Sequence, residues 1–118
     1  MKTLIIGASN NPERYSYKAA ERLLAHNHPI ELLGLRPDIV LNHQINTERK
    51  QFQAIDTVTL YVGPQHQPDY YSYVVSLKPR RVIFNPGTEN EEFMQILQQN
   101  DIKTEVACTL VLLATGQY

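Results

Sequence analysis

The first turn of the chain carries residue types that suit phosphate binding. Leu4–Ile6 form an apolar run, which predicts a strand buried on both faces of a parallel sheet. The turn Gly7–Asn10 follows, and a helical pattern begins near Ser16. A strand–turn–helix unit of this kind can bring backbone amides and a helix N-terminus up to a phosphate. The dinucleotide fingerprint asks for two further glycines, where this chain has Ser9 and Pro12, so a turn with no ligand is the alternative.

Two arginines could contact a ligand at the same edge. Arg36 follows the predicted second strand, where NAD-binding sheets usually carry an acidic residue that holds the ribose. A guanidinium there favours a ligand with a phosphate on its ribose, because it can grip that group bidentately. Coenzyme A and NADP both qualify, with NADP as the second choice. Arg14 could meet a pyrophosphate, and a solvated role is the alternative for both arginines.

Strand and helix patterns alternate along the whole chain. Residues 16–27, 68–77 and 93–100 have helical spacing, and a short helix is expected after Cys108. The predicted strands are Leu4–Ile6, Ile30–Leu35, Thr57–Val62, Arg81–Phe84 and Lys103–Val106, with a short edge strand within residues 39–45. This alternation predicts an α/β fold: a three-layer, doubly wound parallel sheet of about five strands with helices on both faces.

The loops that leave these strands should meet at one place. In a doubly wound sheet the ligand lies beyond the carboxyl ends of the strands, where the strand order reverses. Most of these loops contain glycine or proline near the strand end, which indicates tight turns. The loops are Gly7–Tyr15, the segment from Arg36 onward, Gly63–Gln67 and Asn85–Asn90. Their convergence predicts a cofactor crevice.

Bulk properties narrow the class of protein. A length of 118 residues fits one domain, residues 1–118. The net charge of −1 gives no basic excess for nucleic-acid binding. Cys108 is the only cysteine, so no internal disulfide forms and a reducing compartment is expected. No signal-peptide pattern occurs, and the longest apolar run, Leu110–Ala114, is too short for a membrane span, so we expect a cytoplasmic protein.

Catalytic signals are weak. The four histidines lack the spacing of metal ligands, and no nucleophile elbow occurs. Ser9 and Ser16 suit phosphate contacts or helix caps better than nucleophilic attack. Cys108 follows the last strand, where either a thioester or only a small buried side chain could lie. We therefore predict no catalytic residue and no metal ligand, and binding rather than catalysis.

Several motifs together resemble a known family. Gly7–Ser9 with Pro12, Arg14 and Ser16 resembles the signature turn of the small Rossmann-like CoA-binding proteins. That family is related to the CoA-binding domain of the succinyl-CoA synthetase alpha subunit. Tyr61–Pro64 and Asn85–Asn90 look like the family's second and third ligand loops, and Ala107–Tyr118 is similar to the C-terminus of one branch. The resemblance implies a CoA-binding module.

The function predicted from these observations is non-covalent binding of coenzyme A or an acyl-CoA. The alternatives are an NADP-dependent or acyl-CoA-acting enzyme, and a regulatory or structural subunit with a vestigial nucleotide site. Residues 110–113 should dock on the sheet, and a homodimer interface there is the alternative. The predicted cofactor-binding residues are Gly7, Ala8, Ser9, Asn10, Arg14, Ser16, Arg36, Val62, Gly63, Pro64, Asn85, Pro86 and Gly87.

Overall fold

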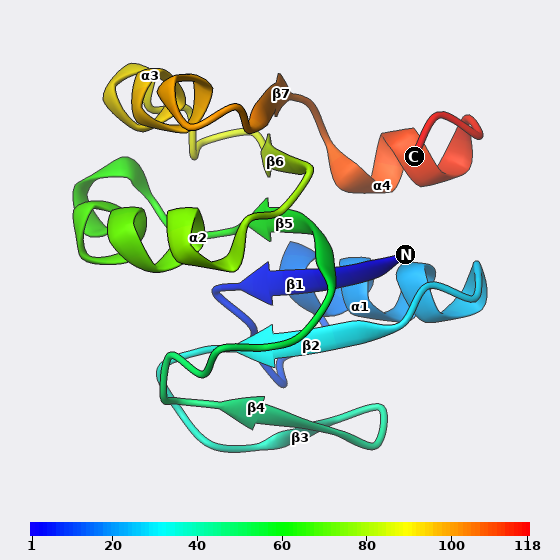
Figure 1. Ribbon diagram of the computed structural model, residues 1–118. Helices are drawn as coiled ribbons and strands as arrows, with labels where there is room; N and C mark the ends of the chain where they lie inside the picture. Colours follow the sequence, from blue (N-terminus) through cyan, green and yellow to red (C-terminus); the bar gives the residue numbers. More distant parts are fainter.

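A computed structural model describes residues 1–118 as one seven-stranded sheet flanked by four α-helices (Figure 1). The strands are β1 (Lys2–Ile6), β2 (Ile30–Leu33), β3 (Ile39–Val40), β4 (His43–Asn46), β5 (Ile55–Leu60), β6 (Arg81–Phe84) and β7 (Lys103–Val106). The helices are α1 (Tyr15–Ala25), α2 (Tyr71–Leu77), α3 (Glu91–Gln99) and α4 (Thr109–Ala114), with the short 3₁₀ turns η1 (Pro64–His66) and η2 (Pro68–Tyr70). None of the helices has the length and apolar character needed to cross a membrane.

The strand order is β3-β4-β2-β1-β5-β6-β7, with β7 and the β3–β4 hairpin at the two edges (Figure 1). Every neighbouring pair is parallel except β3 with β4. The chain moves outward from β1 toward β2 and β4, then returns to the other side of β1 to form β5. The strand order therefore reverses between β1 and β5, and a crevice is expected beyond their carboxyl ends.

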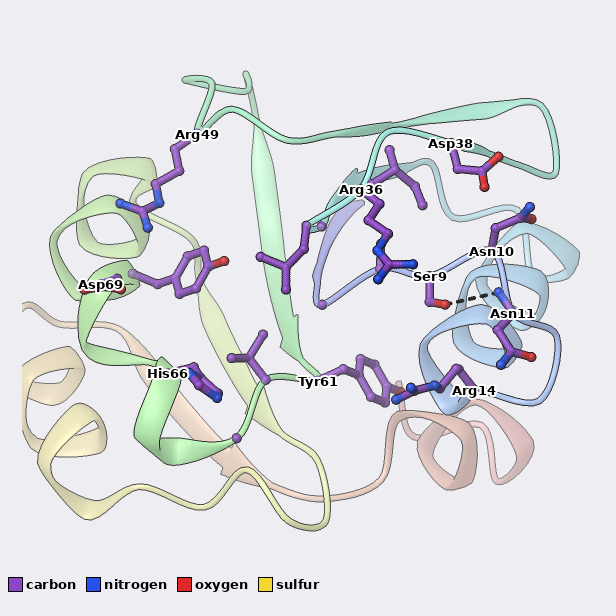
Figure 2. A pocket seen from close by; sticks show the side chains of 18 residues that line it. Ser9, Asn10, Asn11, Arg14, Arg36, Asp38, Arg49, Tyr61, His66 and Asp69 are labelled. Atoms are coloured by element: carbon purple, nitrogen blue, oxygen red, sulfur yellow. Dashed lines mark hydrogen bonds between the residues drawn. The ribbon is translucent and has the colours of Figure 1, made fainter.

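The central strands of the sheet, β1, β5 and β6, are buried on both faces, as their apolar residues predict. Leu4 and Ile6 of β1 belong to a core cluster of 13 residues, whereas Ile5 belongs to a second cluster of eight. The larger cluster includes Phe93 of α3, and the smaller one includes Leu113 of α4. Figure 2 accordingly shows α2 and α3 on one side of the strands and α1 and α4 on the other. Helix α4 thus docks on the sheet, as expected.

The prediction of about five parallel strands is wrong in number and in orientation. Residues 39–46 form two further strands, of which β3 runs antiparallel to β4. The hairpin turns at Leu41 and Asn42, whose φ angles are +49° and +66°. A two-residue turn with positive φ at both positions is normally marked by Asn-Gly or Asp-Gly. Without a glycine at this turn, the sequence signal indicated only one short edge strand.

Two strands end earlier than the sequence pattern predicts. β2 stops at Leu33 and β5 at Leu60, so the residues after them lie in loops. These shifts of two residues move Gly34, Leu35, Tyr61 and Val62 out of the predicted strands to the carboxyl edge, where they join Arg36 and Gly63. Both segments are therefore available to line a ligand site.

Candidate functional site

A cavity of about 860 Å³ opens at the carboxyl ends of β1, β2 and β5 (Figure 2). Its volume lies in the range of small-molecule and cofactor sites. It coincides with the reversal of strand order. The lining residues are Gly7, Ala8, Ser9, Asn10, Asn11, Arg14, Gly34, Leu35, Arg36, Asp38, Ile45, Arg49, Tyr61, Val62, Gly63, His66, Asp69 and Tyr70.

The turn after β1 is fastened to its neighbouring strands. The amides of Gly7 and Ala8 both donate to the Leu33 carbonyl oxygen, at 2.9 and 3.0 Å. Gly7 has a φ of +96°, and a Cβ there would lie 2.8 Å from the carbonyl oxygen of Tyr61. Only glycine fits this position. Any other residue would be strained at this positive φ, and its Cβ would clash with the loop that follows β5. The first two amides of the turn therefore donate within the protein and are not free to bind a ligand.

The next amides of the turn are free. Ser9 and Asn10 donate no backbone hydrogen bond within the chain, whereas the Ser9 hydroxyl accepts from the Asn11 amide at 3.1 Å. Helix α1 follows, with neither a side-chain cap nor an acidic residue in its first turn. Unpaired amides beside an uncapped helix N-terminus favour a bound anion.

The loop after β2 approaches this turn closely. A Cβ on Gly34 would lie 2.6 Å from the Ala8 carbonyl oxygen and 2.9 Å from a methyl carbon of Ile45. Gly34 therefore allows the two loops to form one wall of the cavity. Beyond it, Leu35 is 89% exposed and Arg36 also faces solvent.

Three arginines give the cavity a positive balance. Arg14, Arg36 and Arg49 line it, and none of them forms an ion pair within the chain. Two carboxylates, of Asp38 and Asp69, also line it. Because the chain as a whole carries a net charge of −1, the cavity is locally more positive than the rest of the protein, which favours an anionic ligand.

The loop after β5 is braced from beneath by Gln67. This side chain is fully buried, and its Nε2 donates to the carbonyl oxygens of Val62, at 2.9 Å, and of Thr88, at 2.7 Å. Its Oε1 accepts from Nδ2 of Asn90 at 3.0 Å. These bonds fix the Val62–Gly63 wall of the cavity.

The cavity brings most of the predicted site residues together, from three separate loops. Those that line it are Gly7, Ala8, Ser9, Asn10, Arg14, Arg36, Val62 and Gly63. The others, Ser16, Pro64, Asn85, Pro86 and Gly87, do not line it. Ser16 is buried in the first turn of α1.

Asn85 makes hydrogen bonds only inside the protein. Its Nδ2 donates to Thr59 Oγ1 at 2.6 Å and to the Leu60 carbonyl oxygen at 2.9 Å. Its Oδ1 accepts from the Thr109 amide at 2.9 Å, at the start of α4. The Asn85 side chain thus ties β5, β6 and α4 together.

Sequence reasoning missed part of the cavity wall. Gly34 and Leu35 belonged to the predicted second strand, and Tyr70 to a predicted helix. Arg49 lies in a polar stretch without periodicity, where no signal marked it. The lining residues that were not predicted individually are Asn11, Gly34, Leu35, Asp38, Ile45, Arg49, Tyr61, His66, Asp69 and Tyr70. Of these, Asn11 and His66 lie in predicted ligand loops, and Tyr61 begins a segment that resembles one.

Tyr61 supplies a neutral phenol to the cavity wall. Burial raises the pKa of Tyr61 to about 12, so the hydroxyl stays protonated at neutral pH. No cluster of three or more His, Cys, Asp or Glu side chains could hold a metal ion. Cys108 is half-buried and lies outside the cavity lining. The site is therefore equipped for binding through amides and guanidiniums, whereas the Tyr61 hydroxyl is bonded to Thr109 and Thr59.

Fold and cavity together define an α/β protein with an arginine-lined cavity at the switch point of its sheet. Residues 1–114 match the family described as "CoA binding domain", and the chain belongs to that family. The description of this family supports coenzyme A binding as a property of the family, and it does not support NADP binding.

Solved structures share this fold along nearly the whole chain. A protein described only as uncharacterized is 50% identical, with a TM-score of 0.98, covering 99% of this chain and 97% of its own. A Thermus thermophilus protein is 16% identical, with a TM-score of 0.86 and coverage of 99% and 90%. A hypothetical protein from Pyrococcus horikoshii OT3 is 22% identical, with a TM-score of 0.84 and coverage of 92% and 78%. No curated protein matches the chain.

Proposed function

We propose that this chain binds coenzyme A or an acyl-CoA non-covalently in the cavity of its Rossmann-like sheet. The observation that carries the proposal is the pair of unpaired amides, Ser9 and Asn10, beside the uncapped start of α1 and the arginines Arg14 and Arg36, which form no ion pair. A polyphosphate ligand supplies the negative charge and acceptor oxygens that these donors lack.

Each part of the ligand has candidate partners in the cavity. The Ser9 and Asn10 amides and Arg14 would hold the pyrophosphate at the α1 N-terminus. Arg36 would meet the phosphate on the ribose, since the ribose of a nucleotide lies at the end of the second parallel strand. The braced Val62–Gly63 segment would line the path of the pantetheine arm. The residues act here by binding and orienting, with no catalytic step.

Titration with coenzyme A tests this proposal. We expect saturable heat in calorimetry and a rise in melting temperature, because a ligand that binds the native state stabilises it. In amide NMR spectra the largest shifts should fall on Ser9 and Asn10. The committed amides of Gly7 and Ala8 should move less, and those of Gly87 and Thr88 should serve as references outside the cavity.

Two results would overturn the proposal. One is the lack of any heat or melting shift at millimolar coenzyme A. The other is saturable binding whose amide shifts lie away from the cavity. NADP belongs in the same titration, and tighter binding of NADP than of coenzyme A would assign the cavity to a different nucleotide.

A further inference from the structure

The cavity has a second side whose chemistry differs from the turn after β1. Figure 2 shows Ser9 and Arg14 on one side and His66 on the other, with Arg36 between them. The side opposite the turn is named here the tyrosine end, and it consists of Arg49, His66, Asp69 and Tyr70. A ligand that fills the cavity must satisfy both sides.

Arg49 is preorganised at the tyrosine end. Its Cζ lies 4.7 Å from the centroid of the Tyr70 ring, and it has no ion-pair partner. The carbonyl oxygen of the next residue, Lys50, accepts from the Tyr73 hydroxyl of α2 at 2.5 Å. The Tyr70 amide donates to the carbonyl oxygen of the buried Gln67 at 2.8 Å. Both members of the pair are thus tied to buried structure.

The tyrosine end suits a charged group better than a hydrocarbon chain. Arg49, His66 and Asp69 are exposed polar side chains, and they would lose water to a neutral alkyl chain without compensation. A carboxylate, in contrast, can accept two parallel hydrogen bonds from the guanidinium edge of Arg49 while Tyr70 covers one guanidinium face. Arg49, held against the Tyr70 ring, therefore favours a terminal carboxylate, while the Asp69 carboxylate opposes it.

The ribose phosphate of coenzyme A already has a candidate partner elsewhere. Arg36 follows β2, the position that faces the ribose in dinucleotide-binding sheets. Arg49 lies in the crossover between β4 and β5, beside the 3₁₀ turns that follow Val62–Gly63. The pantetheine arm is proposed to pass Val62–Gly63, so Arg49 is left for the group that this arm carries.

We propose that the tyrosine end selects acyl-CoA thioesters whose acyl chain ends in a carboxylate, with Arg49 as the residue that recognises it. This inference rests on the proposed function, because it assigns the acyl end of a ligand whose nucleotide end occupies the same cavity. It names a substrate class, the thioesters of short dicarboxylic acids.

Calorimetric titration with matched thioester pairs tests the inference. Malonyl-, succinyl- and glutaryl-CoA are each compared with the neutral thioester of equal carbon number, propionyl-, butyryl- and valeryl-CoA. We expect wild type to prefer at least one carboxylate member by on the order of tenfold, which a charge-assisted contact at an exposed site supplies. Arg49→Gln should erase the preference and leave affinity for the neutral thioesters nearly unchanged.

Matched variants separate recognition from general charge effects. Arg22→Gln removes an exposed arginine of α1 that lies outside the cavity, and it should retain the preference. Tyr70→Phe keeps the aromatic ring and should also retain it. Asp69→Asn removes the negative charge at the same end and should increase the preference about two- to threefold.

The outcomes also separate this inference from the function on which it rests. Equal wild-type affinity within every pair, or a preference that survives in Arg49→Gln, would overturn the carboxylate assignment while coenzyme A still binds. Loss of discrimination between coenzyme A and dephospho-CoA in Arg49→Gln would reassign Arg49 to the ribose phosphate. Failure of coenzyme A and all the thioesters to bind would remove the proposed function itself.

Discussion

Two loops at the carboxyl edge have similar composition, but they differ in how their glycine region is bonded and in how the helix that follows is capped. The β1 loop (Gly7–Arg14) and the β6 loop (Asn85–Asn90) each contain a glycine with positive φ, +96° at Gly7 and +89° at Gly87. The β1 loop leaves two amides without partners, those of Ser9 and Asn10. In the β6 loop, the Gly87 amide donates to the carboxylate of Glu89 at 2.9 Å, and the Thr88 amide to the Asn85 carbonyl oxygen at 2.9 Å.

The difference between the β1 loop and the β6 loop indicates which of them can hold a ligand. The helix after the β6 loop, α3, is capped by the Asn90 side chain, which accepts from the Phe93 amide, and it has Glu91 and Glu92 in its first turn, so it has little to gain from a phosphate. The first two amides of a loop can order it by bonding to a neighbouring strand. The next two amides can then stay without partners, and no further conformational entropy is lost when they bind a ligand. The β1 loop is of this kind, and it faces the cavity.

The largest expected effect comes from Gly7→Ala. Positive φ costs an alanine roughly 1–2 kcal/mol, and the approach of its Cβ to the Tyr61 carbonyl oxygen adds about 1–3 kcal/mol of crowding. We expect both terms to appear as lost stability in urea unfolding. Coenzyme A affinity should fall more than tenfold, because the turn must shift.

Gly87→Ala is the matched control. Its φ is nearly the same, but nothing lies within 4 Å of the added Cβ. We expect only the backbone cost of roughly 1–2 kcal/mol and unchanged coenzyme A affinity. Equal losses of stability in the two variants would contradict the close approach at Gly7.

Asn85→Ala should be the next largest effect, on stability alone. It removes the buried partner of the Leu60 carbonyl oxygen and of the Thr109 amide, whereas the Thr59 hydroxyl keeps its bond to Thr109, and the cost is about 2–3 kcal/mol. Chemical unfolding measures this loss. Coenzyme A affinity of the folded protein should change less than threefold, and a stable variant that fails to bind would place Asn85 in the ligand site.

Arg36→Ala extends the comparison to the loop after β2, which shares the cavity with the β1 loop. We expect wild type to prefer coenzyme A over dephospho-CoA about tenfold, or about 1.4 kcal/mol, through a charge-assisted contact. The variant should lose that preference and keep its affinity for dephospho-CoA. The two ligands and two proteins form a cycle that yields the coupling directly. Equal wild-type affinities would remove Arg36 from the ribose phosphate.

Local patterns in the sequence predicted the alternating elements and the β1 turn. Arg81–Phe84 and Lys103–Val106 appear with the predicted bounds, because a short run with β-branched residues or alternating polarity favours a strand. The β3–β4 hairpin was not predicted, since its turn at Leu41 and Asn42 contains no glycine. Its positive φ angles are stabilised by strand pairing that the local sequence does not encode.

The cavity was only partly predictable for a related reason. Gly7 and Arg36 lie next to strand ends, where turn composition and strand order suffice to mark them. Arg49 and Tyr70 meet only because the crossover after β4 packs against α2, a tertiary contact between segments without a shared pattern. Asn85 has the composition of a ligand loop, and only its buried hydrogen bonds reveal a structural role.

The smallest expected effects come from removing one hydroxyl group from each of the two loops. In the β1 loop the Ser9 hydroxyl accepts from the Asn11 amide. In the β6 loop the Thr88 hydroxyl donates to the Asn85 carbonyl oxygen at 2.8 Å. Ser9→Ala loses an exposed contact, so stability should change within about 0.5 kcal/mol while coenzyme A binding weakens about threefold. Thr88→Val keeps the shape but loses a buried bond, so stability should fall by about 1 kcal/mol with binding unchanged. Unfolding curves measure the stability of both variants, and calorimetry measures their affinity for coenzyme A. If both variants lose stability alone, or both lose affinity alone, the contrast between the loops is wrong.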